Sequence, residues 1–292
     1  MFKGTGTALL TPFKSDFSVD YSALKKIVEQ QVKNGIDAIV VLGTTGEAPV
    51  INNDERKKII ATVQEVAAGK SEIIVGTGSN DTAHVVELNK IAEDLKVDGV
   101  LIVNPYYNKG TQASVIEHYK YICERTSLPV ILYNVPSRTG MNIIPETVLK
   151  INDACKNVKG IKEASGNISQ IAHLISMKPD NFNVYSGNDD QTLPIIALGG
   201  VGLISVFSNA FPAQAKKLVS ALLDNNYIEG QKLNNKYLEM MNALFVEASP
   251  MPLKYIMKKL DLCDNVCRLP LTDITDKSEK YLDDVYNRFI KL

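Results

Sequence analysis

The chain has 292 residues and a formal net charge of −1, with 45% hydrophobic and 22% charged residues. This composition is typical of a soluble globular protein with one large α/β domain or two smaller ones. A net charge near zero gives no reason to expect nucleic acid or an anionic membrane as a partner. No basic and apolar leader opens the chain, and no apolar run reaches the ~18 residues of a membrane span, so we expect a cytoplasmic protein.

Eight short apolar runs recur along the chain, and each is continuous rather than strictly alternating. They span residues 4–13, 38–47, 72–80, 98–107, 129–137, 158–166, 183–190 and 202–209. Continuous runs of this length are typical of parallel strands that are covered on both faces. Their starts lie mostly about 20 to 35 residues apart, which leaves room for one crossover helix in each interval.

Amphipathic segments fill the intervals between the runs. Residues 21–35 and 54–69 carry the i, i+3, i+4 apolar stripe of a helix, and both segments end in glycine. Eight βα repeats within residues 1–224 predict an α/β fold of the (β/α)₈ TIM barrel type. A doubly wound open sheet is the alternative, but no run leads through a G-x-G-x-x-G turn into a helix.

The strand pattern stops near residue 225. Residues 227–245 and 277–292 are predicted to be helices packed on the outside of the barrel. No low-complexity linker precedes them, so we interpret 225–292 as a C-terminal helical region of the barrel and not as an independent domain.

Neither the cysteines nor the histidines indicate a metal site. The chain has four cysteines, of which only Cys263 and Cys267 are close in sequence, at the i, i+4 spacing of a helix and without a nearby histidine. We expect Cys263 and Cys267 to be a reduced, packed pair. The other two cysteines are Cys123 and Cys155. The histidines are predicted to be structural because each lies singly in a helical stretch, and they are His84, His118 and His173.

Polar and small residues gather at the carboxyl ends of the predicted strands, where the chemistry of such barrels lies. For three of these residues we expect only a structural role, as caps in strand-to-helix turns, and they are Thr77, Asn104 and Ser208. The glycine-rich run 198–202 precedes the last strand, so it is interpreted as a tight turn at the opposite end of the barrel. The remaining polar ends include a lysine, two tyrosines and an arginine, which turns alone do not explain.

Lys162 lies near the end of the sixth run, beside Glu163. A lysine is costly to bury, and an ion pair with Glu163 or another carboxylate is the simplest structural explanation. However, adjacent strand residues point to opposite faces, so the two side chains should diverge. Desolvation in a barrel mouth favours a neutral, nucleophilic amine, which can condense with a ketone to form a Schiff base.

Imine chemistry needs a proton relay and groups that hold a carboxylate. Tyr133 follows the neighbouring strand, and Thr44 and Tyr107 lie at strand ends that face the same mouth, so a hydroxyl between two phenols could pass a proton. The alternative for Tyr106 and Tyr107 is a hydrophobic plug or a subunit contact. Thr44 and Thr45 offer N–H groups and hydroxyls to a carboxylate.

Arg138 follows the fifth run within the segment NVPSRTG, which would carry it back over the barrel mouth. A guanidinium there could hold a second carboxylate in a bidentate contact. The alternative for Arg138 is a surface salt bridge.

Four segments resemble the dihydrodipicolinate synthase family: GTTGE (43–47), NPYYNKG (104–110), YNVPSRTG (133–140) and GIKEASG (160–166). The likeness runs through essentially the whole barrel. The first and last segments are shared with the wider group of pyruvate-type Schiff-base lyases, which includes N-acetylneuraminate lyase. YNVPSRTG is more specific, because its arginine suits an aldehyde derived from a dicarboxylate.

The resemblance implies an enzyme that condenses pyruvate with L-aspartate-4-semialdehyde to give 4-hydroxy-tetrahydrodipicolinate, in diaminopimelate and lysine biosynthesis. It needs no cofactor and no metal. Family members are commonly homotetramers built from two tight dimers, although dimers also occur. The site residues that the resemblance implies are the imine-forming Lys162, the relay Thr44, Tyr133 and Tyr107 (the last from across a dimer interface), Thr44 and Thr45 for the pyruvate carboxylate, Arg138 for the semialdehyde carboxylate, and the backbone of Gly187 and Ile204.

The chain departs from the family pattern in the cleft where some members are inhibited by lysine. Asn80 and Tyr106 fit that cleft, but Asn53 and Arg56 stand where histidines are usual, and His84 stands where a glutamate is usual. A guanidinium and an imidazole should disfavour a bound α-amino group. We therefore expect weak or absent inhibition by lysine, and half-inhibition at sub-millimolar lysine would contradict this.

Two other functions remain open at this point. A keto-acid aldolase such as N-acetylneuraminate lyase would use the same lysine with another acceptor, and a catalytically silent barrel would serve as a binding or regulatory subunit. Replacement of Arg138 separates the first from the synthase, because it should impair the aldehyde step far more than pyruvate binding. Reductive trapping with pyruvate separates the second, because a silent barrel gains no mass.

Overall fold

Eight parallel strands close into one barrel in the computed structural model, which describes residues 1–291. Each strand pairs with the next along the chain, and β8 pairs with β1 to close the barrel. The strands are β1 Gly4–Ala8, β2 Ala38–Val41, β3 Glu72–Gly76, β4 Gly99–Val103, β5 Val130–Asn134, β6 Val158–Glu163, β7 Asn183–Ser186 and β8 Gly202–Ser205. The predicted TIM barrel is confirmed, and the open doubly wound sheet is wrong.

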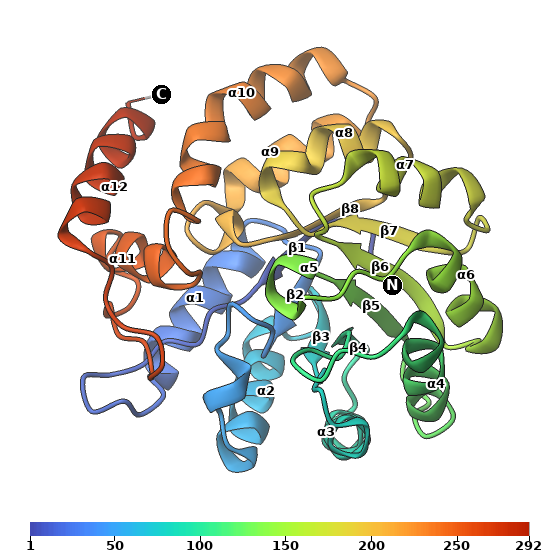
Figure 1. The fold of residues 1–292 in the computed structure, drawn as a ribbon. Helices are drawn as coiled ribbons and strands as arrows, with labels where there is room; N and C mark the ends of the chain where they lie inside the picture. The colour runs from blue at the N-terminus through green and yellow to red at the C-terminus, as the bar shows by residue number, and fades with distance from the viewer. Residues whose placement is uncertain (292) are drawn as a thin grey trace.

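Helices surround the barrel, as Figure 1 shows. They are α1 Tyr21–Lys33, α2 Asn53–Ala67, α3 Thr82–Asp94, α4 Gln112–Cys123, α5 Pro136–Thr139, α6 Pro145–Ala154, α7 Ile168–Met177, α8 Thr192–Ala197 and α9 Pro212–Leu223. Three 3₁₀ turns follow strands, namely η1 Ala48–Val50, η2 Asp189–Gln191 and η3 Phe207–Asn209. As predicted, glycines follow α1 and α2, and Gly35 and Gly69 have φ of 66° and 75°, which favours glycine.

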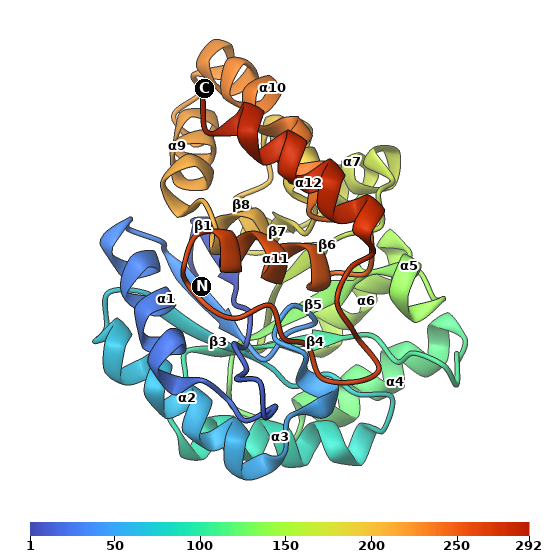
Figure 2. The same cartoon turned by 90° about the vertical axis from the view of Figure 1, so that its left-hand side faces the viewer.

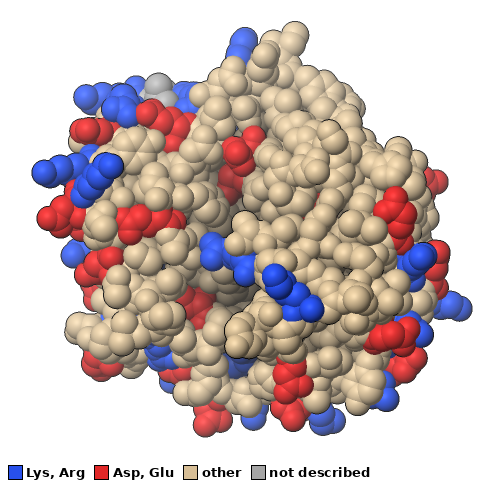
Figure 3. Space-filling model, in the orientation of Figure 1, with Lys and Arg blue, Asp and Glu red and all other residues tan. Residues whose placement is uncertain are grey.

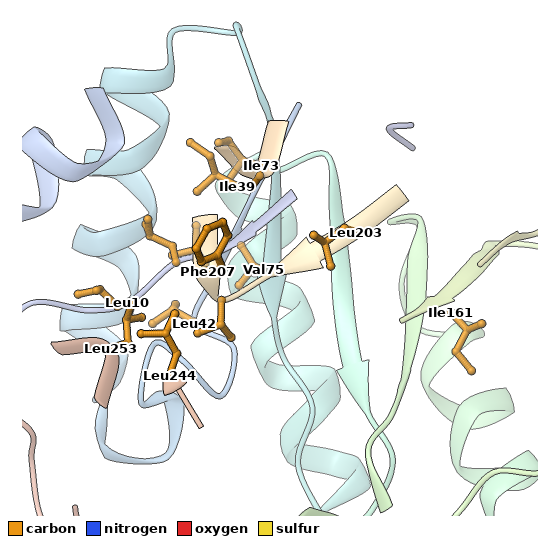
Figure 4. Close-up of a cluster of buried hydrophobic side chains, with 14 of the residues drawn as sticks. Leu10, Ile39, Leu42, Ile73, Val75, Ile161, Leu203, Phe207, Leu244 and Leu253 are labelled. Atoms are coloured by element: carbon orange, nitrogen blue, oxygen red, sulfur yellow. The ribbon is translucent and has the colours of Figure 1, made fainter. Parts of the chain in front are cut away.

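The strands are buried on both faces because they separate two apolar clusters. Successive side chains of a strand point to opposite faces. In β2, Ile39 and Val41 pack toward the helices, whereas Ala38 and Val40 belong to the cluster that fills the barrel interior. Figure 4 shows part of the larger cluster, which lies between the strands and the helices.

Every predicted apolar run contains a strand, but each strand is shorter than its run. The second run was predicted over 38–47, whereas β2 ends at Val41. Leu42 and Glu47 then take φ of 59° and 53°, so the backbone leaves the extended conformation within the predicted run. The residues that follow the strands therefore form turns at the barrel mouth.

Three helices follow the barrel, namely α10 Tyr227–Ala243, α11 Met251–Lys259 and α12 Asp276–Phe289. Figure 2 shows α12 beside α10 and α11, and α10 also packs against α9. The sequence predicted α10 and α12 but not α11. Cys263 and Cys267 lie in the loop between α11 and α12, so the expectation that their spacing follows a helix is wrong.

The C-terminal region was predicted to pack on the outside of the barrel. In the structure it also reaches the barrel mouth. Lys254 of α11 forms an ion pair with Glu47 after β2, so this helix reaches the turns at the barrel mouth. Leu253 of α11 and Leu244 belong to the same core cluster as Leu10 and Leu42 (Figure 4). None of the helices formed by residues 1–291 is long and apolar enough to span a bilayer.

Candidate active site

A cavity of about 580 Å³ opens at the barrel mouth. Its wall is built by the turns after β2, β3, β4 and β5, by α2, α3 and α5, and by the segments before and after α11. Figure 3 shows the face on which α5 lies, with a hollow near its centre and Lys or Arg side chains beside it. Of the residues predicted for the site, Thr44, Tyr133 and Arg138 line this cavity.

Lys162 lies on β6 directly beside Tyr133 of β5. Its side chain is buried, at 5% exposure, and Nζ lies 4.4 Å from the centroid of the Tyr133 ring. No ion pair among residues 1–291 includes Lys162. The structure thus places a buried amine without a salt-bridge partner beside a ring that lines the cavity.

Glu163 points away from Lys162, as the strand geometry predicts. Its carboxylate accepts hydrogen bonds from Asn134 Nδ2 at 3.0 Å and from the backbone N–H of Ser165 at 2.9 Å. Burial raises the pKa of Glu163, and these hydrogen bonds oppose that rise. The simple structural explanation, an ion pair between Lys162 and Glu163, is wrong.

Gly187 directly follows β7, Ile204 lies on β8, and neither residue lines the cavity wall. A Cβ atom on Gly187 would lie 2.7 Å from Ala164 Cβ and 3.1 Å from Lys162 Cγ. Only glycine therefore lets the chain after β7 lie so close to the lysine stem. Ile204 of β8 is fully buried in the interior cluster that also contains Tyr133.

Thr44 and Thr45 stand in the tight turn after β2. Thr45 is buried at 4% exposure, and Thr44 is half-buried on the cavity wall. The N–H of Gly46 donates to the carbonyl of Gly43 at 3.1 Å, and the N–H of Glu47 donates to the carbonyl of Thr44 at 3.1 Å. The turn thus presents Thr44 to the cavity.

Arg138 lies on α5, where its side chain is exposed and lines the cavity. Its Nη2 donates to the carbonyl oxygen of Ser249 at 3.4 Å. The ion pairs among residues 1–291 do not include Arg138, so the alternative of a surface salt bridge is wrong. The guanidinium is available to a ligand in the cavity.

Tyr107 does not join the other predicted residues within one chain. It is 89% exposed, with φ of 68°, and it does not line the cavity. The preceding residue, Tyr106, lines the cavity instead. The structure therefore brings together Thr44, Tyr133 and Arg138 around the cavity, with Lys162 behind Tyr133, and leaves Tyr107 outside.

The whole barrel and its C-terminal helices match one protein family. The family model described as "Dihydrodipicolinate synthetase family" matches residues 1–288. The chain belongs to the dihydrodipicolinate synthetase family. The predicted family and the predicted activity, that of a 4-hydroxy-tetrahydrodipicolinate synthase, are confirmed by close relatives.

A 4-hydroxy-tetrahydrodipicolinate synthase of Fervidobacterium nodosum is 44% identical over 288 residues, covering 99% of this chain and 98% of the relative. The crystal structure of dihydrodipicolinate synthase from Thermotoga maritima has a TM-score of 0.97 at 43% identity and covers all of both chains. A monomeric dihydrodipicolinate synthase variant also has a TM-score of 0.97, at 42% identity, covering 100% of this chain and 98% of that one. The chain is therefore a lyase of diaminopimelate and lysine biosynthesis.

Three residues interpreted as helix caps do not cap the helices that follow them. Asp81 and Thr111 cap α3 and α4 through their side chains, whereas α9 begins at Pro212 without a side-chain cap. Asn104 Nδ2 instead donates to the carbonyl of Met141 at 3.2 Å, and Ser208 Oγ lies 2.7 Å from Thr7 Oγ1. Thr77 is buried, and its hydroxyl has no partner among residues 1–291. The predicted capping role is wrong for all three.

Sequence reasoning missed Asp189, which is completely buried in η2 near Lys162. Its carboxylate accepts from Ser205 Oγ at 2.5 Å and from the backbone N–H groups of Val206 and Phe207 at 3.0 and 3.1 Å. Burial raises the pKa of Asp189, while these hydrogen bonds and the charge of Lys162 oppose the rise. The paired aspartates at the end of the seventh run were the available signal.

The sequence also missed the buried ion pair that anchors the turn after β2. The Glu47 carboxylate binds Lys254 Nζ and accepts from the N–H of Arg268 at 2.9 Å. The side chains of Lys254 and Glu47 are 0% and 2% exposed. No local pattern joins positions 47 and 254, so only the fold reveals that the C-terminal region supports the threonine turn.

Proposed function

We propose that this chain condenses pyruvate with L-aspartate-4-semialdehyde through an imine on Lys162, and that it releases 4-hydroxy-tetrahydrodipicolinate. The observation that carries the proposal is the buried amine of Lys162, which has no ion-pair partner within residues 1–291 and lies 4.4 Å from the ring of Tyr133. Because the amine is not held in a salt bridge, it is available to attack a keto group.

The covalent steps balance without a further reactant. Lys162 Nζ attacks the keto carbon of pyruvate, a water molecule leaves, and a protonated imine forms. The imine withdraws electrons, so a methyl proton is lost and an enamine results. The enamine carbon attacks the aldehyde carbon and forms the new C–C bond. The amino group of the second substrate then displaces Nζ from the imine carbon, which closes the ring and frees the lysine.

Thr44 and Tyr133 move the protons of these steps in the same chain. Both line the cavity, and Tyr133 contacts Lys162 directly. Thr44 and Thr45 hold the pyruvate carboxylate through the turn after β2, because such a turn presents N–H groups and hydroxyls together. The backbone at Gly187 and Ile204 completes the pocket around the imine, and the missing side chain of Gly187 leaves room for it.

Arg138 holds the carboxylate of the semialdehyde. It lines the cavity, and its only protein hydrogen bond within residues 1–291 is the 3.4 Å contact with the carbonyl of Ser249. A planar guanidinium with free donors matches a carboxylate in two parallel hydrogen bonds. This contact favours a second substrate that carries a carboxylate near its aldehyde.

The assembly we propose is a homotetramer built from two dimers, in which Tyr107 enters the active site of the neighbouring subunit. Its 89% exposure and its outward position support this arrangement.

Residues 225–292 act as an appendage of the barrel, which the buried pair of Lys254 and Glu47 supports. The compartment we propose is the cytoplasm. All four cysteines are free thiols, and free thiols persist in that reducing compartment.

A coupled assay tests the proposed substrates. The enzyme is given pyruvate with L-aspartate-4-semialdehyde and, in parallel, N-acetylneuraminate and other keto-acid aldols. We expect turnover only with the semialdehyde, because Arg138 offers a charged contact and not a site for sugar hydroxyls. Turnover of N-acetylneuraminate in preference to the semialdehyde would assign the chain to the aldolase alternative, and no turnover of any pair would favour a silent barrel.

A further inference from the structure

The loop that carries Arg138, residues 135–142, is closed at its base by one side chain, that of Asn134 at the end of β5. The Oδ1 atom of Asn134 accepts from the backbone N–H of Ile143 at 3.0 Å, and its Nδ2 atom donates to Asn142 Oδ1 at 2.9 Å. The loop includes α5, on which Arg138 stands. The position of the guanidinium over the cavity therefore depends on how Asn134 holds the two ends of the loop together.

Glu163 of β6 fixes the direction in which the amide of Asn134 faces. Both carboxylate oxygens accept from Asn134 Nδ2, at 3.0 and 3.2 Å. A carboxylate accepts hydrogen bonds and does not donate them, so the nitrogen of the amide must face it. The oxygen of the amide then faces the N–H of Ile143, which is the contact that closes the loop.

Two further amides tie the same loop to α7. Asn142 Nδ2 donates to Gln170 Oε1 at 2.7 Å, and Gln170 Nε2 donates to Asn142 Oδ1 at 3.1 Å. The amides of Asn134, Asn142 and Gln170 could all turn by 180° together and keep the hydrogen bonds between them, because each amide has both a donor and an acceptor. The Glu163 carboxylate accepts only, so it selects one of the two arrangements.

Glu163 has no counter-charge within the part of the chain that the structure describes. It is 1% exposed, and the ion pairs of residues 1–291 do not include it. A buried carboxylate without a cation costs stability, and an apolar side chain would fill the same space at a lower cost. The effect on the direction of Asn134 is what an apolar side chain does not supply.

We propose that Glu163 is a positioning residue for Arg138, and that through Asn134 it sets the selectivity of the site for an aldehyde that carries a carboxylate. This inference rests on the role proposed above for Arg138. Successive residues of a strand point to opposite faces, so β6 supplies the amine of Lys162 on one face and the anchor of the arginine loop on the other. Loss of the Glu163 carboxylate should leave the amine in place and let the loop take more than one position.

Steady-state kinetics of the intact enzyme, with each substrate varied in turn, tests the proposal. In Glu163→Leu, we expect kcat/KM for L-aspartate-4-semialdehyde to fall about 10-fold, mainly through its KM. The KM for pyruvate should change by less than about twofold, because the threonine turn that is proposed to hold pyruvate does not contact the loop. Glu163→Gln keeps one acceptor oxygen and should lose less than Glu163→Leu.

Glu93→Gln is the matched control. The Glu93 carboxylate also holds a loop, since it accepts from Thr126 Oγ1 and from the N–H of Ser127, both at 2.7 Å. It lies near the end of α3, and its partners precede β5, so this loop is at the end of the barrel opposite the mouth. Both kinetic values should stay at the wild-type level.

A double-variant comparison separates positioning from a general loss of structure. If Glu163 acts through Arg138, Glu163→Leu should cause little further loss in a chain that already carries Arg138→Gln, whereas independent effects would multiply. A further 10-fold loss in that background would overturn the proposal, as would equal losses of kcat/KM for both substrates. If Glu163→Leu does not fold, Glu163→Gln takes its place, and a wild-type kcat/KM for the semialdehyde in that variant would contradict the proposal.

The wild-type rate separates this inference from the proposed function. Absence of turnover with the semialdehyde in the wild type would refute the proposed function and this inference together. Turnover in the wild type that Glu163→Leu leaves unchanged would refute only the positioning role of Glu163.

Discussion

At the scale of single residues, the proposed chemistry depends on an amine that is buried without a salt-bridge partner. Lys162 is 5% exposed, and Glu163 beside it turns to Asn134 and Ser165. The buried carboxylate on the other side, Asp189, is already engaged by three donors and acts on Lys162 only as a nearby charge. The amine of Lys162 is thus not held in an ion pair among residues 1–291 and is available for the proposed reaction.

Replacement of Arg138 by glutamine should impair the step that uses the second substrate. We expect kcat/KM for the semialdehyde to fall about 10- to 100-fold, which corresponds to the loss of a charged hydrogen bond. The KM for pyruvate should change by less than about threefold, because in the proposed site a different turn holds the pyruvate carboxylate. Steady-state kinetics with each substrate varied in turn measures both values.

The matched control is Arg138→Lys, which keeps the charge but cannot form two parallel hydrogen bonds. It should recover part of the lost kcat/KM. A parallel loss of pyruvate affinity in both variants would mean that Arg138 shapes the whole site and does not hold the semialdehyde.

The sequence could identify Lys162 because two local facts point to it, namely its position at the end of an apolar run and its divergence from Glu163. It could not identify Asp189 in the same way. The partners of Asp189 are Ser205, which ends the next strand, and Val206 and Phe207, which follow it, and their contacts arise only when β7 and β8 pair. For Asn104 the local pattern misled, because its amide binds Met141 beyond the following strand.

At the scale of elements, a buried ion pair ties α11 to the turn that carries Thr44 and Thr45. Lys254 also donates to the carbonyl of Val266, and its Nζ lies 4.1 Å from the centroid of the Phe13 ring. The pair fixes the loop after α11 against the barrel mouth. The sequence predicted the turn but not α11, and hydrophobic periodicity contains no information about which elements touch.

Lys254→Met should lower the free energy of unfolding by about 3 to 5 kcal/mol, because it leaves the buried Glu47 carboxylate without its partner. The double variant Glu47→Gln with Lys254→Met should recover a large part of this loss. Chemical denaturation at fixed protein concentration measures both. Equal stability of Lys254→Met and the wild type would show that the pair does not hold the turn.

The contact between α3 and α4 should make stability depend on pH. His118 of α4 is 7% exposed, its Nδ1 lies 2.9 Å from Thr82 Oγ1, and burial lowers the pKa of His118 to about 4. The unfolded chain therefore binds a proton more readily than the folded one. The stabilisation is fully present above the unfolded pKa of ~6.5 and is lost as the pH falls toward the folded pKa.

Between pH 7.5 and pH 5, we expect this group to reduce the free energy of unfolding by about 2 kcal/mol. His118→Gln should remove that component and leave the remaining pH dependence in place. Denaturation of both proteins at the two pH values measures the difference. The same decrease in the variant and in the wild type would assign the pH dependence to other groups.

At the scale of the whole molecule, the position of Tyr107 outside its own cavity predicts that active sites are shared between subunits. Tyr107→Phe and Lys162→Arg should each abolish most of the activity when alone. Mixed dimers of the two variants contain one site with both native groups. Random reassembly of equal amounts should restore about a quarter of the wild-type rate, because half of the dimers are mixed and each has one intact site.

If Tyr107 acted in its own chain, every site in the mixture would lack one group and no activity would return. The wild-type enzyme taken through the same dissociation and reassembly is the control for recovery.

Sequence periodicity could predict the closed barrel, because each run and helix is a local signal. It could not place Tyr107, because exposure depends on where the chain after β4 turns.

The most direct test of the reaction is mass spectrometry after incubation with pyruvate and reduction with borohydride. We predict that the chain gains about 72 Da, the mass of one reduced pyruvyl group, and that peptide mapping locates the group on Lys162. The Lys162→Arg variant should gain no mass and should lose turnover. An adduct on another lysine, or unimpaired turnover by Lys162→Arg, would contradict the central role of this amine.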